Sequence, residues 1–466
     1  MRTQGRSAVF SFLVVAALAA SLAGCGDRGA RRGGSVERAA EASPAVEPPV
    51  RTLPPLPARP LSPRLEAERT RAAVEAARLR GLAWLAPVGM TELSGWEYGT
   101  RTRELADVLG GDDLAALSRL AVAGGILPEG TDLAALASTF TAVAADATYS
   151  PLDKQVLLVS GSAKDVKDSA RRHSLFTHEH VHALQDQHFD LLRMLLARPY
   201  NFDRTEAAFA VVEGDAVNVQ RRLEEGDAAF ARRPLSEIWR QEDARFATAR
   251  RQVGAFFPPL LTETFFFRYR DGSRFVEAVR RARPGADAAN ELFRRPPAST
   301  EQVLHPEKYL AGEGPREAAL DEPRFASEGW RAPASTPLGE MGVRGLLLAG
   351  VAAQEAERAA AGWGGDRAYV FEREGSPPLF AWRTLWDKPS DAAEFFRAYN
   401  SLLRRTTRAG TDESEAQRGV GESQAREVVW RDGALVIVVR LEADAVLILR
   451  GAEADVQSAA RLARAG

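Results

Sequence analysis

The feature that most constrains this chain is the pentapeptide His178-Glu179-His180-Val181-His182, which has the form H-E-x-x-H. Residues four apart lie on one face of an α-helix, so His178 and His182 can hold one metal ion through neutral imidazole nitrogens. Glu179 then lies beside the metal, where it can take a proton from a bound water. This geometry is typical of zinc hydrolases. A solvated or hydrogen-bonded pair of histidines is the alternative interpretation.

A catalytic zinc usually has three protein ligands, so one more must come from elsewhere in the chain. The chain has six histidines, and no H-x-x-G-x-x-H extension follows the motif, which favours a glutamate on a later helix. Glu213 lies in an apolar stretch, where a carboxylate is costly unless it is paired or bound to metal. Glu206, one heptad earlier on a similar face, is the alternative. Asp215 could orient a ligating histidine.

Other residues could take part in the chemistry. A His or Tyr near a catalytic metal can donate a hydrogen bond to the oxyanion of a tetrahedral intermediate. We assign this role to His305, with Tyr309 and Tyr269 as further candidates; a histidine that only fixes a loop is the alternative for His305. His180 lies about 200° round the helix from His178 and is not expected to reach the same metal.

The N-terminus predicts a lipoprotein. Two arginines precede an apolar stretch, residues 8–20, which is too short for an ordinary transmembrane helix. Leu22-Ala23-Gly24-Cys25 resembles the lipobox of bacterial lipoproteins, and Cys25 is the only cysteine, so it cannot form an internal disulfide. We expect a signal peptide at 1–24, a lipid on Cys25, and a location in the cell envelope on the outer side of a bacterial membrane. A plain secretory signal is the alternative.

The composition is that of a soluble globular protein, with 27% charged residues and a formal net charge of −2. This balance gives no indication of a nucleic-acid partner. Residues 25–63 are rich in Pro, Ala and Arg and predict a disordered tether. We divide the remainder into a metallopeptidase-like domain at 64–334 and a smaller module at 335–466.

Periodicity and turn residues predict the main elements of both parts. In the first part we expect a strand at 156–159, after a turn at 150–154, that leads into the motif helix. An edge strand at this place in zincins lines the substrate cleft, although an ordinary sheet strand is equally compatible. In the second part, Thr336-Pro337 begins a helix that runs to Ala361. Trp363-Gly364-Gly365-Asp366 predicts a tight turn. The remaining expected elements are helices at 65–79, 102–109, 112–123, 132–145, 391–405 and 453–464, strands at 368–372, 379–385, 428–430, 435–440 and 445–450, and a hairpin at Asp432-Gly433.

These segments together resemble a known family. HEHVHALQDQHFDL followed by VVEGDA is similar to the gluzincin-type metallopeptidases, zincins whose third ligand is a glutamate, and to a group of secreted or lipid-anchored bacterial and archaeal proteins of that kind. The resemblance implies His178, His182 and Glu213 as zinc ligands and Glu179 as the general base. Ala147-Thr148-Tyr149 departs from the Gly-Phe/Tyr turn expected there. Further matching segments, spread over residues 79–396, are ATYSPLDKQVLLV, FFFRYRDGSRFVEAV, RPPASTEQVLHPEKY, LGE and AAAGWGGDR.

The sequence therefore predicts an α+β protein. Its mainly helical, zincin-like domain carries a small sheet with an edge strand, and an α+β module without a chemical signature of its own follows. The predicted function is zinc-dependent hydrolysis of peptide or protein substrates by a membrane-anchored enzyme. The alternatives are a non-catalytic, lipid-anchored binding or assembly protein on the same scaffold, and a zinc amidase that acts on cell-wall material.

Overall fold

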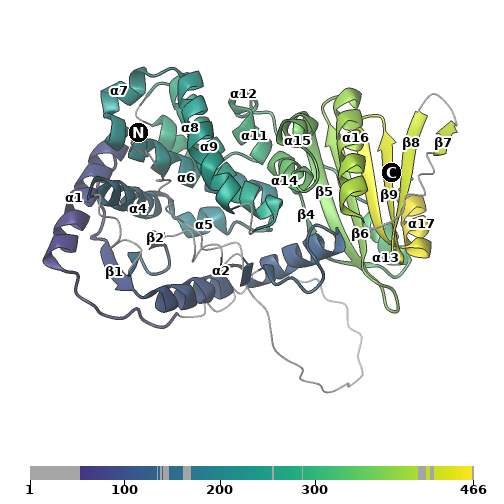
Figure 1. Ribbon diagram of the computed structural model, residues 1–466, viewed down its shortest axis with the longest axis horizontal. Coiled ribbons are helices and arrows are strands. Elements are labelled where there is room, and N and C mark those ends of the chain that lie inside the picture. The colour runs from purple at the N-terminus through teal and green to yellow at the C-terminus, as the bar shows by residue number, and fades with distance from the viewer. Residues whose placement is uncertain are drawn as a thin grey trace, which may run out of the picture.

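The structure is a computed structural model that describes residues 53–133, 135–136, 139, 146–160, 169–253, 257–285, 287–407, 416–419 and 424–463. The predicted signal peptide, Cys25 and most of the predicted tether lie outside these residues. Figure 1 shows a helical region beside a region built on a seven-stranded sheet. The predicted α+β class is thus confirmed.

The helical region contains a small sheet and most of the helices. Its elements are α1 (Pro63–Arg80), β1 (Gly89–Leu93), α2 (Gly95–Ala123), β2 (Ala147–Ser150), β3 (Gln155–Val159), α4 (Ser169–Phe189), α5 (Leu191–Leu195), α6 (Phe202–Glu225), α7 (Asp227–Arg232), α8 (Leu235–Val253), α9 (Pro259–Ala282), α10 (Ala288–Arg294), α11 (Thr300–Leu304) and α12 (Pro306–Ala311).

The sheet region follows, and its first strand crosses the boundary that we predicted at residue 335. Its elements are α13 (Glu322–Ser327), β4 (Arg331–Thr336), α14 (Gly339–Leu347), α15 (Ala353–Ala360), β5 (Trp363–Glu372), β6 (Leu379–Trp386), α16 (Pro389–Thr406), β7 (Ala416–Gly419), β8 (Gln424–Asp432), β9 (Leu435–Glu442), β10 (Ala445–Ala452) and α17 (Glu453–Leu462).

Side-chain caps fix several helix starts. The Ser62 hydroxyl accepts a hydrogen bond from the Leu65 amide at the start of α1, and Ser94 and Glu97 form a capping box at the start of α2. The two helices predicted at 102–109 and 112–123 are one continuous helix, which passes through Gly110 and Gly111. Because helix propensity is a weak preference, packing along α2 overrides the break that two glycines favour.

The small sheet has the strand order β1-β3-β2. The strand predicted at 156–159 is present as β3, but it is the central strand and not an edge. β3 pairs in parallel with β1 and antiparallel with β2. The edge strand nearest the motif is β2, which the sequence analysis left without a strand prediction, because four residues are too few for a clear alternating pattern.

Three helices, α4, α6 and α9, pack together at the centre of the helical region. Helices α6 and α9 cross at two glycines. A Cβ atom on Gly214 would lie 2.2 Å from the carbonyl carbon of Gly272, and one on Gly272 would lie 2.2 Å from the carbonyl oxygen of Ala210. The two backbones are therefore in direct contact, at a point one residue after Glu213.

The large sheet has the order β4-β5-β6-β10-β9-β8-β7, and its neighbouring strands are antiparallel. Successive side chains of its strands point alternately into two apolar clusters. In β9, Ile437 and Val439 belong to the main core, and Val436 and Val438 belong to a second one. Helix α16 packs on strands β6, β9 and β10, and α17 packs on β9 and β10. The predicted strands, the Asp432-Gly433 hairpin and the two helices of this part are confirmed.

Two predictions in this part are wrong. The helix expected from Thr336 to Ala361 is split into α14 and α15, and Gly364 and Gly365 lie within strand β5 and not in a tight turn. These glycines permit a close backbone approach, because a Cβ atom on Gly365 would lie 2.1 Å from the carbonyl oxygen of Arg316.

Helix α2 joins the two regions. Its 29 residues contact β1 and β3 of the small sheet and β4, β5 and β6 of the large sheet. At its C-terminal end, Arg450 of β10 donates a hydrogen bond to the Ala123 carbonyl oxygen, at 2.8 Å. Figure 1 shows α2 running beneath the helical region toward the sheet.

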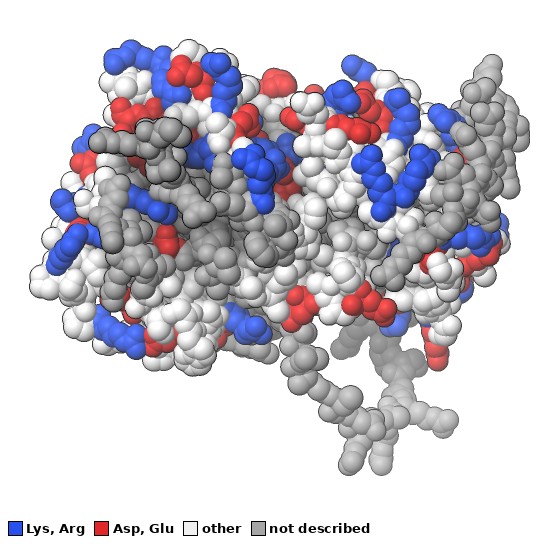
Figure 2. Space-filling view, in the orientation of Figure 1, with Lys and Arg blue, Asp and Glu red and all other residues white. Residues whose placement is uncertain are grey.

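Residues 53–62, the last part of the predicted tether, lie extended on the helical region. Arg59 forms an ion pair with Glu97 at 2.7 Å, and Arg101 donates to the Pro54 carbonyl oxygen at 2.9 Å. Within the described residues, every helix is too short or too polar to cross a bilayer. Figure 2 shows acidic and basic side chains interspersed over the described part of one face.

Candidate metal centre

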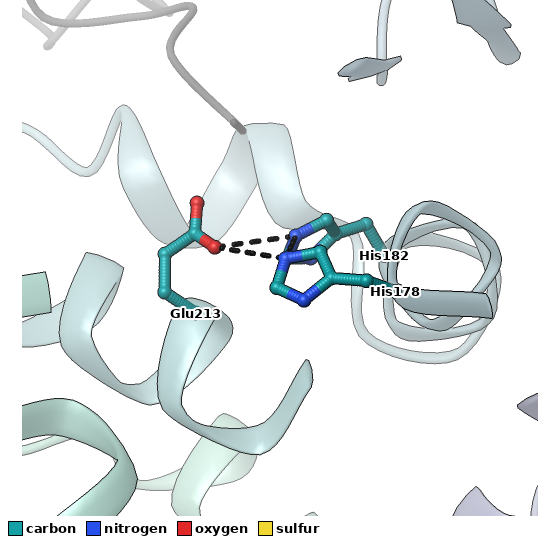
Figure 3. Close-up of side chains that lie close together, drawn as sticks. All are labelled: His178, His182 and Glu213. Atoms are coloured by element: carbon teal, nitrogen blue, oxygen red, sulfur yellow. Dashed lines mark hydrogen bonds and ion pairs between the residues drawn. The ribbon is translucent and has the colours of Figure 1, made fainter. Parts of the chain in front are cut away.

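Helices α4 and α6 bring His178, His182 and Glu213 together (Figure 3). The Nε2 atoms of the two histidines lie 3.0 Å apart, and each is 3.3 Å from Oε2 of Glu213. A tetrahedral zinc with bonds of about 2.0–2.1 Å places its ligand atoms about 3.3 Å from one another. The three donor atoms therefore have the chemistry and the spacing of a three-ligand zinc set.

The cluster is shielded from solvent. His182 and Glu213 are 0% exposed, and His178 is 1% exposed. Burial favours the uncharged form of His178 and lowers its pKa. Burial acts in the same direction on His182, but the Glu213 and Glu179 carboxylates outweigh it and raise the pKa of His182 to about 9. The two imidazoles in turn keep the pKa of Glu213 well below 4.5, although burial alone would raise it. Glu213 is thus held as an anion.

Hydrogen bonds around His182 set its orientation. The amide nitrogen of Gln185 donates to the Val212 carbonyl oxygen at 3.1 Å and to the Asp215 carboxylate at 2.9 Å. The Gln185 carbonyl oxygen therefore faces His182 Nδ1, at 2.9 Å, and that nitrogen must carry the proton. This arrangement turns Nε2 of His182 toward the cluster, and it gives Asp215 a role that is indirect, through Gln185.

Glu206 does not join the cluster. Both of its carboxylate oxygens accept hydrogen bonds from Arg268 of α9, each at 2.7 Å, and both side chains are buried. The Arg268 guanidinium also lies over the Phe209 ring, 4.2 Å from its centroid. Of the two glutamates considered from the sequence, the structure brings Glu213 to the histidines and pairs Glu206 with an arginine.

Glu179 is fully buried beside the cluster and contacts the edge strand. The backbone amide of Tyr149 in β2 donates to Glu179 Oε2 at 2.7 Å. The Tyr149 hydroxyl donates to Asp186, also on α4, at 2.7 Å, and Lys154 donates to the same carboxylate oxygen at 2.7 Å. Tyr149 thus fastens β2 to α4 at two points and holds one oxygen of Glu179 in place.

Tyr269 is the candidate phenol that lies at the cluster. Its ring stacks on His178, with centroids 6.4 Å apart and an interplanar angle of 22°. Burial, together with the Glu213 and Glu179 charges, holds the pKa of Tyr269 well above 10, so it stays a hydroxyl donor. Tyr269 lies about one helical turn before Gly272 on α9, and Glu213 directly precedes Gly214 on α6. Because the two helices cross at these glycines, Tyr269 lies near Glu213.

His305 and Tyr309 contact other parts of the fold. His305 Nε2 lies 3.0 Å from the Glu340 carboxylate of α14, and this ion pair raises the pKa of His305. The Tyr309 hydroxyl donates to the Arg295 carbonyl oxygen at 2.8 Å. His180, as expected, is turned away from the cluster, and its Nδ1 lies 2.6 Å from the Phe176 carbonyl oxygen.

A second group of metal-ligating residue types consists of Glu301, Glu313 and Asp387. The ammonium group of Lys308 lies among them, at 2.6, 2.9 and 2.7 Å from their respective carboxylate oxygens. A lysine cation already neutralises this group. Among the described residues, the His178 cluster is therefore the better candidate for a metal ion.

Four residues around the cluster were not expected from the sequence: Arg80, Tyr149, Gln185 and Asp186. Arg80 donates to the Asp215 carboxylate at 2.6 Å. Gln185 and Asp186 follow His182 by three and four positions, a spacing that places them on its side of the helix. This spacing could therefore have been recognised in the sequence. Arg80 and Tyr149 come from α1 and β2, and only the tertiary fold brings them to the centre.

The fold and the cluster together define the molecule as an α+β protein with a buried His-His-Glu group between helices. The family model for a domain of unknown function, DUF8575, matches residues 318–461, which comprise most of the sheet region. The cluster lies outside that match. No curated protein matches the sequence significantly.

One solved structure is similar over 54% of this chain and 92% of its own. It comes from Chloroflexus aurantiacus and is described as a candidate hydrolase with a novel fold. The sequence identity is 18% and the TM-score is 0.31. A similarity at this level supports no conclusion about the fold or activity of the present chain.

Proposed function

We propose that this protein is a zinc-dependent hydrolase that cleaves peptide bonds and is held on the outer side of a bacterial membrane by a lipid on Cys25. The observation that supports the catalytic part is the approach of His178 Nε2, His182 Nε2 and Glu213 Oε2 to within 3.0–3.3 Å of one another. Two imidazoles and one carboxylate form the donor set of a catalytic zinc site of the His₂Glu kind, and a binding zinc ion would displace the proton that His182 carries without it.

In the proposed reaction Glu179 is the general base, next to the ligands and oriented by the Tyr149 amide. A zinc ion bound there would polarise the substrate carbonyl and lower the pKa of a water molecule. Glu179 would take a proton from the attacking water and pass it to the leaving amine. Tyr269, whose hydroxyl keeps its proton, is better placed than His305 to donate to the developing oxyanion.

A second candidate function follows from the burial of the centre. Glu179, His182 and Glu213 are 0% exposed, so a substrate can reach them only if the surrounding elements move. A protein that binds zinc in an enclosed site and acts as a lipid-anchored binding or assembly factor has the same geometry. An intact Glu179 favours the enzyme, since a purely structural site does not need a base.

The test uses the full-length protein and two variants, Glu179→Gln and Glu301→Gln. Both replace a buried helical glutamate, but Glu301 pairs with Lys308 away from the cluster. We expect about one zinc per chain in all three by elemental analysis. Hydrolysis of a denatured protein should fall by a factor of roughly 10²–10⁴ in Glu179→Gln alone, the usual size of a general-base contribution.

Other outcomes would change the conclusion. Absence of zinc from the unmutated protein would overturn the metal site, and equal hydrolysis by Glu179→Gln would overturn the assignment of the base. Zinc without hydrolysis in the unmutated protein would support the binding protein instead. Membrane association that persists in Cys25→Ser would contradict the lipid anchor.

A further inference from the structure

A buried chain of hydrogen bonds connects the candidate metal centre to the first helix. It runs from His182 Nδ1 to Gln185 Oε1, at 2.9 Å, and from Gln185 Nε2 to Asp215 Oδ2, at 2.9 Å. Arg80, the last residue of α1, donates from Nε to the same Asp215 oxygen at 2.6 Å. All four residues are buried, and the most exposed of them, Arg80, is 7% exposed. The chain thus joins elements that are 135 residues apart.

The direction of each hydrogen bond in this chain follows from its acceptors. A guanidinium only donates, and a carboxylate or a carbonyl oxygen only accepts. Asp215 and the Val212 carbonyl oxygen therefore both accept from the amide nitrogen of Gln185. Arg80 holds the Asp215 carboxylate in place. The Gln185 oxygen then accepts from His182 Nδ1, and Nε2 of His182 faces the other two members of the cluster.

We propose that Arg80 is a positioning residue for the metal centre: through Asp215 and Gln185 it holds the His182 ring in the orientation that binds zinc. The inference rests on the zinc binding proposed above. Without Arg80, the Asp215 carboxylate loses the donor that holds it. The Gln185 amide nitrogen then keeps only the Val212 carbonyl oxygen as a firmly placed partner. Gln185 can shift, and the oxygen that orients the His182 ring shifts with it, so that His182 Nε2 is aimed less well at a metal.

A matched control is present in the same pair of helices. Arg172 of α4 forms a buried ion pair with Glu68 of α1, with Nη2 donating at 2.8 Å. This pair, like that of Arg80 and Asp215, ties α1 to the central helices, and its members are 6% and 4% exposed. Among the described residues its contacts do not include His182 or Gln185. Arg172→Met therefore removes a comparable stabilising interaction without touching the chain.

The experiment measures zinc affinity by competition with a chromophoric chelator and records the visible spectrum after cobalt substitution. Both use the full-length protein. We expect Arg80→Met and Asp215→Asn each to weaken zinc binding about 10–100-fold, the usual effect of losing an outer hydrogen-bond partner of a ligand. The double variant should bind no more weakly than the weaker single variant, because both changes break one chain. The cobalt spectrum should change in Arg80→Met and Asp215→Asn. In Arg172→Met it should remain the same as that of the unmutated protein.

The possible failures are distinct. If Arg80→Met binds zinc as tightly as the unmutated protein does, the role of Arg80 is overturned, but the proposed function is not. Equal losses of affinity in Arg80→Met and Arg172→Met would show a merely structural effect and also overturn it. No zinc binding by the unmutated protein would overturn the proposed function as well. If Arg80→Met does not fold, Arg80→Lys, which keeps the charge but loses the planar fork, should bind with intermediate affinity, and unchanged affinity there would contradict the proposal.

Discussion

Buried carboxyl groups have opposite surroundings in two parts of this molecule. Around the candidate metal centre, three of them face cations or imidazoles. Glu206 is paired with Arg268, Asp215 with Arg80, and Glu213 lies against two histidines that keep its pKa below the usual range. Glu213 therefore stays ionised although water does not reach it.

Two carboxyl groups at the junction with the large sheet, Asp203 and Asp366, face neutral donors. Asp203 of α6 accepts from the Thr300 amide at 2.8 Å and from the Thr300 hydroxyl at 2.5 Å. Asp366 of β5 accepts from two tryptophan side chains and from the amides of Leu338 and Gly339. Burial raises the pKa of Asp203 to about 8, and it raises that of Asp366 as well.

Gly339 lies between the two junction carboxyls. Its φ is +74°, its amide donates to Asp366, and a Cβ atom there would lie 1.8 Å from Asp203 Oδ1. The comparison shows that burial alone does not decide the state of a carboxyl group. A paired cation keeps it charged, and without one burial drives it toward the neutral acid. Asp203 and Asp366 are held by neutral hydrogen bonds, whereas the three carboxyl groups around the metal centre face charged or ionisable partners.

The largest expected effect separates the two glutamates of α6. Glu213→Gln should weaken zinc binding by more than the roughly 100-fold that loss of an outer partner costs, because a direct ligand is removed. Glu206→Gln should keep zinc affinity but lower the free energy of unfolding by about 3–5 kcal/mol, since Arg268 is left buried and unpaired. Chelator competition and urea unfolding measure the two quantities. If Glu206→Gln weakens zinc binding and Glu213→Gln does not, Glu206 is the third ligand.

The next effect is a dependence of the free energy of unfolding on pH, which arises from Asp203 at the junction. The pKa of Asp203 is about 8 in the folded protein and near 3.8 in an unfolded chain, so the folded state holds an extra proton between these values. The free energy of unfolding should therefore fall as pH rises from about 4 to 8, by several kcal/mol at most, because each pKa unit is about 1.4 kcal/mol. Asp203→Asn should remove most of this dependence.

Urea unfolding at pH 5 and pH 8 measures that slope. Asp190→Asn is the control, since Asp190 caps α5 in an exposed position and its replacement should leave the slope unchanged. If the slope is the same in Asp203→Asn and in the unmutated protein, Asp203 is ionised when folded, and the contrast between centre and junction fails at this residue.

The smallest effect compares two buried tyrosines that hold β2. Tyr149 donates to Asp186 and contacts Glu179 through its amide, whereas the Tyr98 hydroxyl lies 2.9 Å from the Thr148 hydroxyl. Tyr149→Phe and Tyr98→Phe should each lower the free energy of unfolding by about 1–3 kcal/mol, the cost of a buried partner left unsatisfied. Only Tyr149→Phe should also lower kcat, by several-fold at unchanged zinc content. Equal kcat in both variants would show that Tyr149 does not position Glu179.

The sequence predicted the cluster better than its surroundings. The spacing of His178 and His182 requires only one helix, so the motif was enough to place them on one face. The apolar stretch around Glu213 indicated burial, and the structure brings that residue to the histidines. The choice between Glu213 and Glu206 could not be made from local sequence, because it depends on Arg268 of α9.

Strand and helix predictions succeeded where the pattern was local and failed where the chain is shaped by distant contacts. The alternating residues of β9 and β10 were assigned correctly. The glycines of β5 were not, because the backbone of residue 316 approaches them. His305 was assigned to the oxyanion on sequence context, whereas its contact with Glu340 of α14 depends on how the two regions pack.

Helix α2 also has a consequence for the order in which the protein is made. Its N-terminal half can pack as soon as β1 and β3 have been synthesised. Its C-terminal turn ends against Arg450, which lies 327 residues further along the chain. Until β4, β5 and β6 have left the ribosome, one half of α2 lacks the strands that cover it. A chain truncated before β4 would keep that half of the helix uncovered, a candidate surface for chaperone binding or aggregation.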